Sequence, residues 1–118
     1  MTEISPSLLL DSNAQPANGV TTAKPVYWPG GNLSVTYQGV FAGASAQLVC
    51  TTNMPPNGTV PDTPTDWMAD DDWIPLGDAY TGQAKSGYMV DYGHVNPCML
   101  AIKISDSANT TRIKALIG

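Results

Sequence analysis

The 118-residue chain has few charged residues, one histidine, two cysteines and one phenylalanine. Charged residues make up 13% of the sequence, about half of the usual ~25%. Lysine and arginine number only five and are scattered along the chain. Without a cationic cluster, little counterion release from nucleic-acid phosphates is available. We therefore expect no nucleic-acid partner.

Long apolar runs are also missing. The run Leu8 to Leu10 is far too short to span a bilayer, and no basic amphipathic segment is present. This run follows Glu3 rather than a positively charged region, so we expect no signal peptide. A membrane partner is not expected either.

Cysteine is too rare for a disulfide scaffold, because the chain contains only Cys50 and Cys98. Since no export signal is expected, we predict that both are reduced thiols buried as small apolar side chains. A single disulfide between neighbouring strands is the alternative.

Motifs of known catalytic sites are absent. No nucleophile elbow, phosphate loop or dinucleotide-binding fingerprint occurs. His94 and Cys98 offer two metal ligands where a zinc site needs three or four. The acidic run 70–72 lacks the spacing of a calcium loop and predicts a solvated loop. We expect no enzymatic activity, no cofactor and no metal; a small enzyme built around His94 is the alternative.

Glycine and proline are frequent, at 11 and 10 residues, and favour turns over long helices. Between them lie short segments with alternating or extended patterns that predict strands. Six or seven strands are expected, near residues 8–10, 33–37, 46–50, 73–76, 88–92, 98–104 and 110–117, and residues 26–28 are expected to be an extended segment. The predicted core consists of Leu33, Val35, Leu48, Cys50, Trp73, Leu100, Ile102, Ile104 and Ile113.

These patterns predict an all-β fold, either a small jelly roll or a β-sandwich, with an extended N-terminal arm. The arm covers residues 1–31 and the β-sandwich or jelly-roll domain covers residues 32–118. The connection 39–44 is predicted to be a hairpin or a bulge. Residues 51–72 form a long proline-rich loop, and loops of this length are often functional.

From about Asn32 to the C-terminus, the chain resembles small β-rich structural proteins of tailed bacteriophages. The resemblance is carried by Phe41-Ala42-Gly43-Ala44-Ser45-Ala46-Gln47-Leu48 and, after a polar loop, by Trp73-Ile74-Pro75-Leu76-Gly77. The Asp-Gly loop motif of those proteins is replaced here by the proline-rich insertion. The size, the net charge of −5 and the polar arm resemble capsid decoration or cement proteins. This resemblance implies a protein without enzymatic activity that clamps the major capsid protein from outside.

We therefore expect the chain to bind the major capsid protein on the exterior of a virion, after synthesis in the host cytoplasm. We also expect it to associate with itself as a dimer or trimer. Apolar residues of the arm and the loop are the expected partner-binding residues, because such segments cannot bury them internally. These residues are Ile4, Leu8, Leu10, Trp28, Met54 and Trp67.

A different function stays open. The tryptophans Trp28, Trp67 and Trp73 could form a sugar-stacking platform, which would make the chain a carbohydrate-binding β-sandwich module that adheres to the host surface. That hypothesis requires the three rings to be exposed and roughly coplanar. The alternative places Trp73 in the core and uses Trp28 and Trp67 to anchor the arm and the loop, or inserts Trp28 into a partner.

Overall fold

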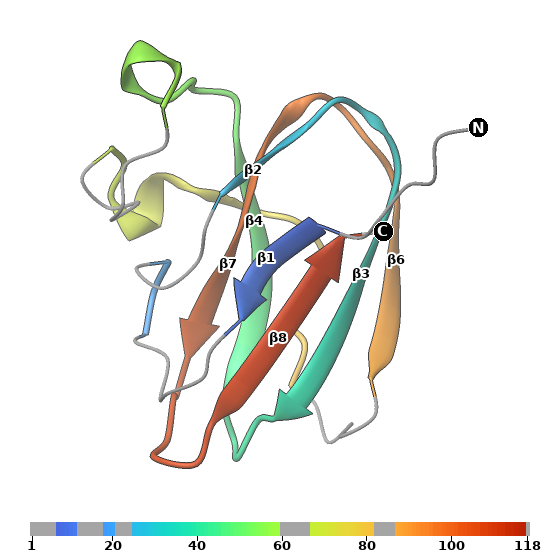
Figure 1. Cartoon of the computed structure of the whole chain (residues 1–118), viewed down its shortest axis with the longest axis vertical. Coiled ribbons are helices and arrows are strands. Elements are labelled where there is room, and N and C mark those ends of the chain that lie inside the picture. The colour runs from blue at the N-terminus through green and yellow to red at the C-terminus, as the bar shows by residue number, and fades with distance from the viewer. Residues whose placement is uncertain (1–6, 12–17, 21–24, 60–66, 82–86, 118) are drawn as a thin grey trace.

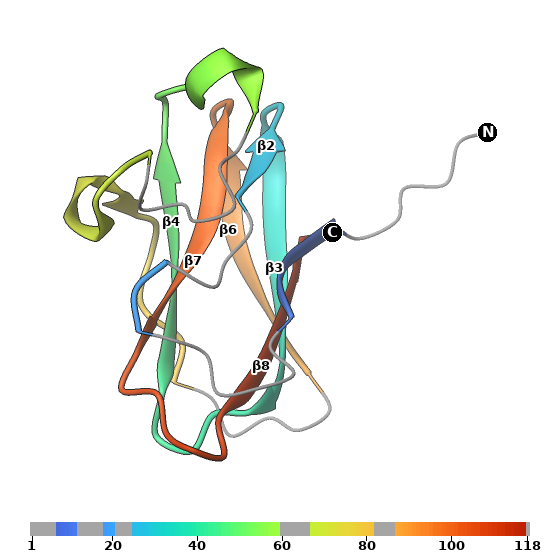
Figure 2. The same ribbon diagram turned by 60° about the vertical axis from the view of Figure 1, so that its left-hand side comes forward.

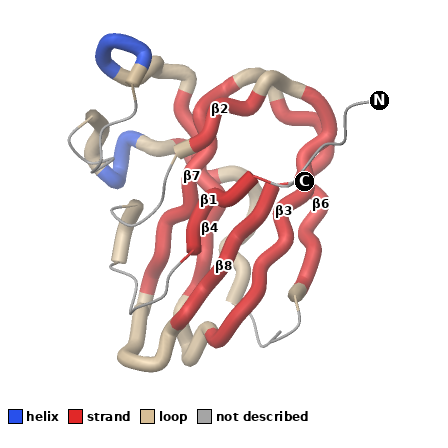
Figure 3. Tube along the Cα trace, in the orientation of Figure 1, coloured by secondary structure: helices blue, strands red, loops and turns tan. Residues whose placement is uncertain are grey.

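The computed structural model describes residues 7–11, 18–20, 25–59, 67–81 and 87–117. Within this part of the chain the regular structure consists of strands and two single 3₁₀ turns, which confirms the all-β prediction (Figures 1 and 3). The strands are β1 Ser7–Asp11, β2 Val26–Trp28, β3 Gly31–Val40, β4 Ser45–Thr51, β5 Ile74–Pro75, β6 Tyr88–Val95, β7 Cys98–Ser105 and β8 Arg112–Ile117. The turns are η1 Pro56–Gly58 and η3 Asp70–Asp72.

The strands form two antiparallel sheets that pack face to face (Figure 2). One sheet has the order β1-β8-β3-β6 and the other has the order β2-β7-β4-β5. The first strand therefore pairs with the last, the second with the seventh, the third with the sixth and the fourth with the fifth. A long antiparallel hairpin rolled into two sheets has this connectivity, which is that of a jelly roll.

The connection between β3 and β4 is a crossing from one sheet to the other, so the prediction of a hairpin there was wrong. β3 pairs with β6 and β8, whereas β4 pairs with β5 and β7. Gly39 has φ +106°, and a Cβ atom there would lie 2.0 Å from the carbonyl oxygen of Arg112. Glycine at this position thus lets β3 lie close to β8 just before the crossing, and the turn itself lies at residues 41–44, where the Ala44 N–H donates to the carbonyl oxygen of Phe41. Alternation identifies strands but not their partners, and glycine-rich connections serve hairpins and crossings alike.

Most of the predicted core lies on the inner faces of the two sheets. Cys50 is half-buried and the other predicted core residues are buried. The buried ones are Leu33, Val35, Leu48, Trp73, Leu100, Ile102, Ile104 and Ile113. In β8, Ile113, Ala115 and Ile117 point into this core, as the alternation predicts.

The sheet β2-β7-β4-β5 is buried on its outer face as well. Val49, Met99 and Ala101 lie on that face by strand alternation, yet each is at most 4% exposed. Residues 67–73 of the loop between β4 and β5, which include the buried Met68 and Trp73, lie on the side of this sheet away from the other sheet (Figure 2). Val49 is therefore a core residue, which the alternation of β4 did not predict.

One lateral side of the sandwich, here called the closed side, is formed by β1, residues 18–20 and β2. β1 pairs with β8, Gly19 exchanges two backbone hydrogen bonds with Ile104, and β2 pairs with β7. Val20 is completely buried there. The described strands of the arm are thus edge strands of the two sheets. No helix that could cross a bilayer occurs among the described residues.

Candidate functional site

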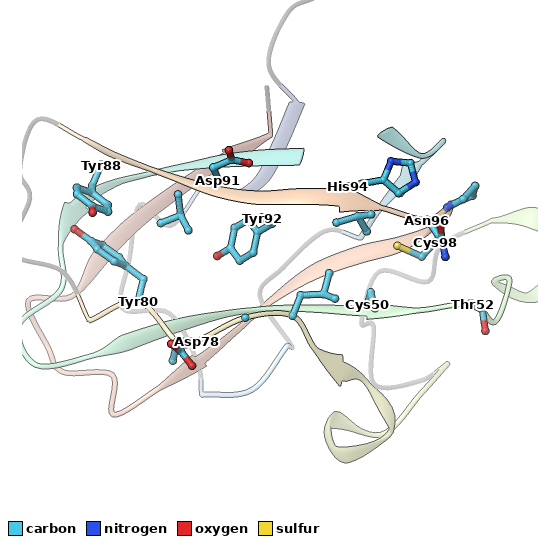
Figure 4. A pocket seen from close by; sticks show the side chains of 16 residues that line it. Cys50, Thr52, Asp78, Tyr80, Tyr88, Asp91, Tyr92, His94, Asn96 and Cys98 are labelled. Carbon is cyan, nitrogen blue, oxygen red and sulfur yellow. The ribbon is translucent and has the colours of Figure 1, made fainter. Parts of the chain in front are cut away.

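The opposite lateral side, here called the open side, lies between the edge strands β5 and β6. Residues 76–80 continue from β5 along β4, because Tyr80 and Ala46 exchange two backbone hydrogen bonds. Between this segment and β6 lies a cleft of about 680 Å³ (Figure 4). A volume of that size lies within the range of small-molecule and side-chain binding sites.

Stacked tyrosines close one end of the cleft. The Tyr80 ring lies between the rings of Tyr37 and Tyr88, with centroids 5.0 Å and 5.1 Å away, and Phe41 packs edge-on against it at 5.3 Å. Tyr80 comes from the segment after β5, whereas Tyr37 and Tyr88 come from β3 and β6. The stack therefore joins the two sheets, and it ends at Tyr88, which is 54% exposed.

The walls of the cleft meet again at Tyr92. Gly77 packs against the Tyr92 ring so closely that a Cβ atom at Gly77 would lie 3.1 Å from Cε1. The Tyr92 hydroxyl shares a hydrogen bond of 2.6 Å with the hydroxyl of the buried Tyr37. Burial raises the pKa of both tyrosines, and their hydrogen bond raises that of Tyr37 further. Both phenols therefore stay neutral, and neither is suited to act as a base at neutral pH.

The two cysteines line the other end of the cleft. Cys50 lies directly opposite Leu100, so Cys98 lies diagonally across from it on the same face of the β4–β7 pair. Both are free thiols, as predicted. Burial raises the pKa of Cys98 to about 11, and it also raises the pKa of Cys50. Because the thiolate is the reactive form, neither residue is an activated nucleophile.

The charged groups around the cleft favour a neutral or basic occupant. Asp78, Asp91 and His94 line it, and its described lining contains no lysine or arginine. Asp91 is exposed at the rim, where its Oδ1 accepts a hydrogen bond of 2.8 Å from the backbone N–H of Gly93. This bond fixes the carboxylate beside the free edge of β6.

The predicted partner-binding residues are not brought together into one patch by the described structure. Ile4 and the side chains of Leu8 and Leu10 lie outside the described part. Trp28 is half-buried, and its Nε1 donates to the carbonyl oxygen of Val95 at 3.1 Å. Trp67 also packs partly against the core, whereas Met54 is 63% exposed.

A tryptophan platform for sugars is not formed. Trp73 is 4% exposed and belongs to the core. Trp67 meets it edge-on, with ring centroids 5.5 Å apart and an interplanar angle of 79°. Trp28 lies on the other side of the sheet, in β2, where alternation points it inward. These rings anchor segments of the chain to the sandwich instead of presenting coplanar faces.

Ligand sets for a metal are not found within the described residues, since no three His, Cys, Asp or Glu side chains lie close enough together there. His94 is exposed on β6, opposite Asn32. In the acidic run, Asp71 is almost fully exposed and lies 3.6 Å from the Lys103 ammonium. An ion pair this exposed contributes little to stability.

The cleft itself was not predicted from the sequence. Tyr88, Val90 and Tyr92 alternate along β6, which was a signal that they share a face. Tyr80 lies outside any periodic segment, so no local pattern placed its ring between Tyr37 and Tyr88. The cleft lies between residues 76–80 and β6, which belong to different sheets. Alternation within a strand does not reveal which segments of the two sheets lie opposite each other.

Comparison of the chain with protein-family models, with curated proteins and with solved structures gives no match. Its function is therefore argued from the resemblance in sequence pattern and from the site. A jelly-roll fold alone does not decide between functions, because the same fold carries many.

Proposed function

We propose that this protein is a structural virion protein of a bacteriophage, a decoration or cement subunit that binds the major capsid protein from the outside of the shell. The observation that carries the proposal is the open side, where the edge strand β6, whose one ladder partner among the described residues is β3, lies beside a preformed cleft. Two large side chains of that strand, Tyr88 and Met89, are 54% and 67% exposed. Exposed aromatic and methionine side chains around a cleft are typical of protein interfaces.

The charge of the chain supports a position on the outside. With a net charge of −5, the protein is repelled by packaged DNA. The jelly-roll connectivity is compatible with the proposal, since viral capsid domains share it, although lectin domains do so too.

Attachment of many copies explains how a small domain would stabilise a shell. The described residues form one sandwich with a short cleft, so a single contact is expected to be weak. Self-association as a dimer or trimer would let several contacts act together and raise the overall affinity. The exposed Met54, on the loop between β4 and β5, offers a second contact point.

Cosedimentation with undecorated capsids of the phage that encodes the chain tests this function. The full-length protein should sediment with the shells and saturate at a fixed number of copies per capsomer. Unlabelled protein should displace labelled protein, which controls for non-specific adhesion. Absence of saturable attachment to such shells would contradict the proposal.

A carbohydrate-binding module is the second candidate, and the tyrosines rather than the tryptophans favour it. The half-exposed Tyr88 ring stands at the rim of the cleft, and Asp78 and Asn96 also line it. An aromatic ring with nearby carboxylate and amide groups can stack on a sugar and bond its hydroxyls. Titration with a panel of neutral oligosaccharides, followed by tyrosine fluorescence, separates the candidates. Saturable quenching that Tyr88→Ser abolishes, without attachment to capsids, would favour the carbohydrate function.

A further inference from the structure

β6 is an eight-residue strand at the edge of its sheet. Within the described residues its ladder partner is β3, on one side only. In an antiparallel strand, alternate residues turn their backbone N–H and C=O groups away from the partner. β6 therefore presents a row of hydrogen-bonding groups along the rim of the cleft, which is a template for one more strand.

The two faces of β6 differ in chemistry. Val90, which lies opposite the buried Val35, lines the cleft. Tyr92 also lines it and points into it (Figure 4). Met89 and Asp91 lie on the outer face, opposite Thr36 and Ser34 of β3, and both are exposed. A strand laid beside β6 would place every second side chain in the cleft and the others beside Met89 and Asp91.

We propose that β6 binds its partner by strand addition: an extended segment of the partner protein pairs its backbone with Tyr88–Asp91. Alternate side chains of that segment are apolar and enter the cleft, and one facing Asp91 is basic. The inference rests on the proposed function in requiring a protein partner, and it specifies how that partner is bound.

The cleft suits the apolar half of such a segment. Its inner lining combines Leu76, Val90 and Val95 with the Tyr92 ring, and its volume of about 680 Å³ accommodates several side chains. The described lining carries carboxylates and no lysine or arginine. Charge complementarity therefore selects a segment with a basic residue at the rim.

The regular part of β6 sets the length of the pairing. The register with β3 shifts between Leu33 and Ser34, opposite Asp91–Gly93, and Gly93 has φ +72°. Such a bulge interrupts a flat edge and discourages pairing beyond it. The added strand should therefore end near Asp91.

A second copy of this chain is a poorer occupant of the edge. Symmetric antiparallel pairing of Tyr88–Asp91 with its own copy would place the Asp91 carboxylates of both copies in one short ladder, beside two acidic clefts. Like charges facing each other across strands are destabilising, and each chain carries a net charge of −5. A segment of opposite charge from a different protein avoids this repulsion.

Hydrogen–deuterium exchange of the full-length protein, free and attached to undecorated capsids, reads out strand addition directly. Backbone pairing should slow exchange of the outward-pointing amides within Tyr88–Asp91 by about tenfold or more, because these amides gain acceptors. A side-chain contact in the cleft without backbone pairing would leave those amides exchanging as in the free protein.

A pair of matched double variants tests the charge argument. Met89→Lys with Asp91→Asn adds one positive charge and removes one negative charge on the outer face of β6, a net change of +2, and asparagine keeps an acceptor for the Gly93 N–H. We expect attachment to weaken by about tenfold or more. The control is Val40→Lys with Asp106→Asn, which makes the same charge change at exposed sites that do not line the cleft. Asp106 has φ 58°, which asparagine adopts readily, and the control should attach like the unmodified chain.

The outcomes separate this inference from the proposed function. Failure of the full-length protein to attach to shells overturns both. Attachment with unchanged exchange in β6, or equal attachment of the two double variants, overturns strand addition and leaves the proposed function standing. Displacement from the shell by a neutral oligosaccharide would also overturn it, since the cleft would then hold a sugar. Thermal unfolding of both variants confirms that they are folded.

Discussion

On the closed side of the sandwich, β1, residues 18–20 and β2 join the edges of both sheets, whereas on the open side residues 76–80 contact β6 only in places. The closed side buries Val20 completely and pairs Gly19 with Ile104. The open side is bridged by the tyrosine stack and by the contact of Gly77 with Tyr92, and a cleft remains between them.

The closed side and the open side use different types of side chain, because water is excluded from one and reaches the other. An apolar side chain such as Val20 stabilises the fold only if water is excluded from it. Tyrosine combines a large apolar ring with a hydroxyl that tolerates water, so it can line a cleft that is not sealed. The closed side therefore contributes stability, and the open side is the part of the molecule that is available for binding.

The largest effect is expected from breaking the closed side. Deleting residues 1–31 removes β1 and β2, uncovers the edges of β7 and β8, and takes away the buried Val20. Loss of both edge strands exposes unpaired backbone and core side chains, so we expect no cooperative thermal unfolding transition and a tendency to aggregate. A truncated protein that melts cooperatively near the temperature of the full chain would show that the closed side is dispensable.

A smaller loss is expected from breaking the bridge on the open side. Tyr80→Ala removes the ring between Tyr37 and Tyr88 and should destabilise the protein by about 2–4 kcal/mol, measured by urea unfolding. Tyr80→Phe keeps the stack and should cost less than about 1 kcal/mol. Equal losses for the two variants would mean that the hydroxyl rather than the ring holds the sheets together.

The thiols at the end of the cleft predict a weaker, pH-dependent effect. Burial raises the pKa of Cys98 from 9.0 to about 11, so the neutral thiol is favoured in the folded protein. Its contribution to stability is complete below pH 9.0 and is lost as the pH rises through about 11. The free energy of unfolding of the unmodified chain should fall over this interval. The free energy of unfolding of Cys98→Ala should fall less steeply over the same interval. A steeper fall of the free energy of unfolding in Cys98→Ala would contradict the prediction that titration of the Cys98 thiol causes this loss of stability.

The strands were largely predictable from the sequence because one-sided burial imposes a period of two. The alternation of Leu33, Val35 and Tyr37, and that of Ile113, Ala115 and Ile117, correspond to buried faces. Residues 26–28 were predicted to be extended because prolines at positions 25 and 29 disfavour a helix there, and in the structure they form the three-residue strand β2.

The pairing of the strands and the cleft were not predictable in the same way. In a jelly roll the first strand pairs with the last, and no local pattern encodes such a distant partner. Val49 was left out of the predicted core because alternation assumes one buried face, whereas β4 is buried on both faces and Met68 and Trp73 of an aperiodic loop belong to the same hydrophobic cluster. The cleft forms because the edge strand β6 and residues 76–80 remain apart along part of their length. Their separation is a property of the assembled sheets.

The smallest effect on stability is expected for a substitution of Met54. This residue allows a comparison between side chains that stabilise the fold and side chains that are exposed to a partner. Among the predicted partner-binding residues with described side chains, Trp28 and Trp67 pack on the core and Met54 is 63% exposed. Met54→Ser should change the free energy of unfolding by less than about 0.5 kcal/mol, because no buried contact is lost. If the loop contacts the capsid protein, the same variant should attach to shells about fivefold to tenfold more weakly. Val40→Ser, which removes another exposed apolar side chain, serves as the control and should leave attachment unchanged. Attachment of Met54→Ser at the level of this control would remove the loop from the interface and leave the open side as the binding surface.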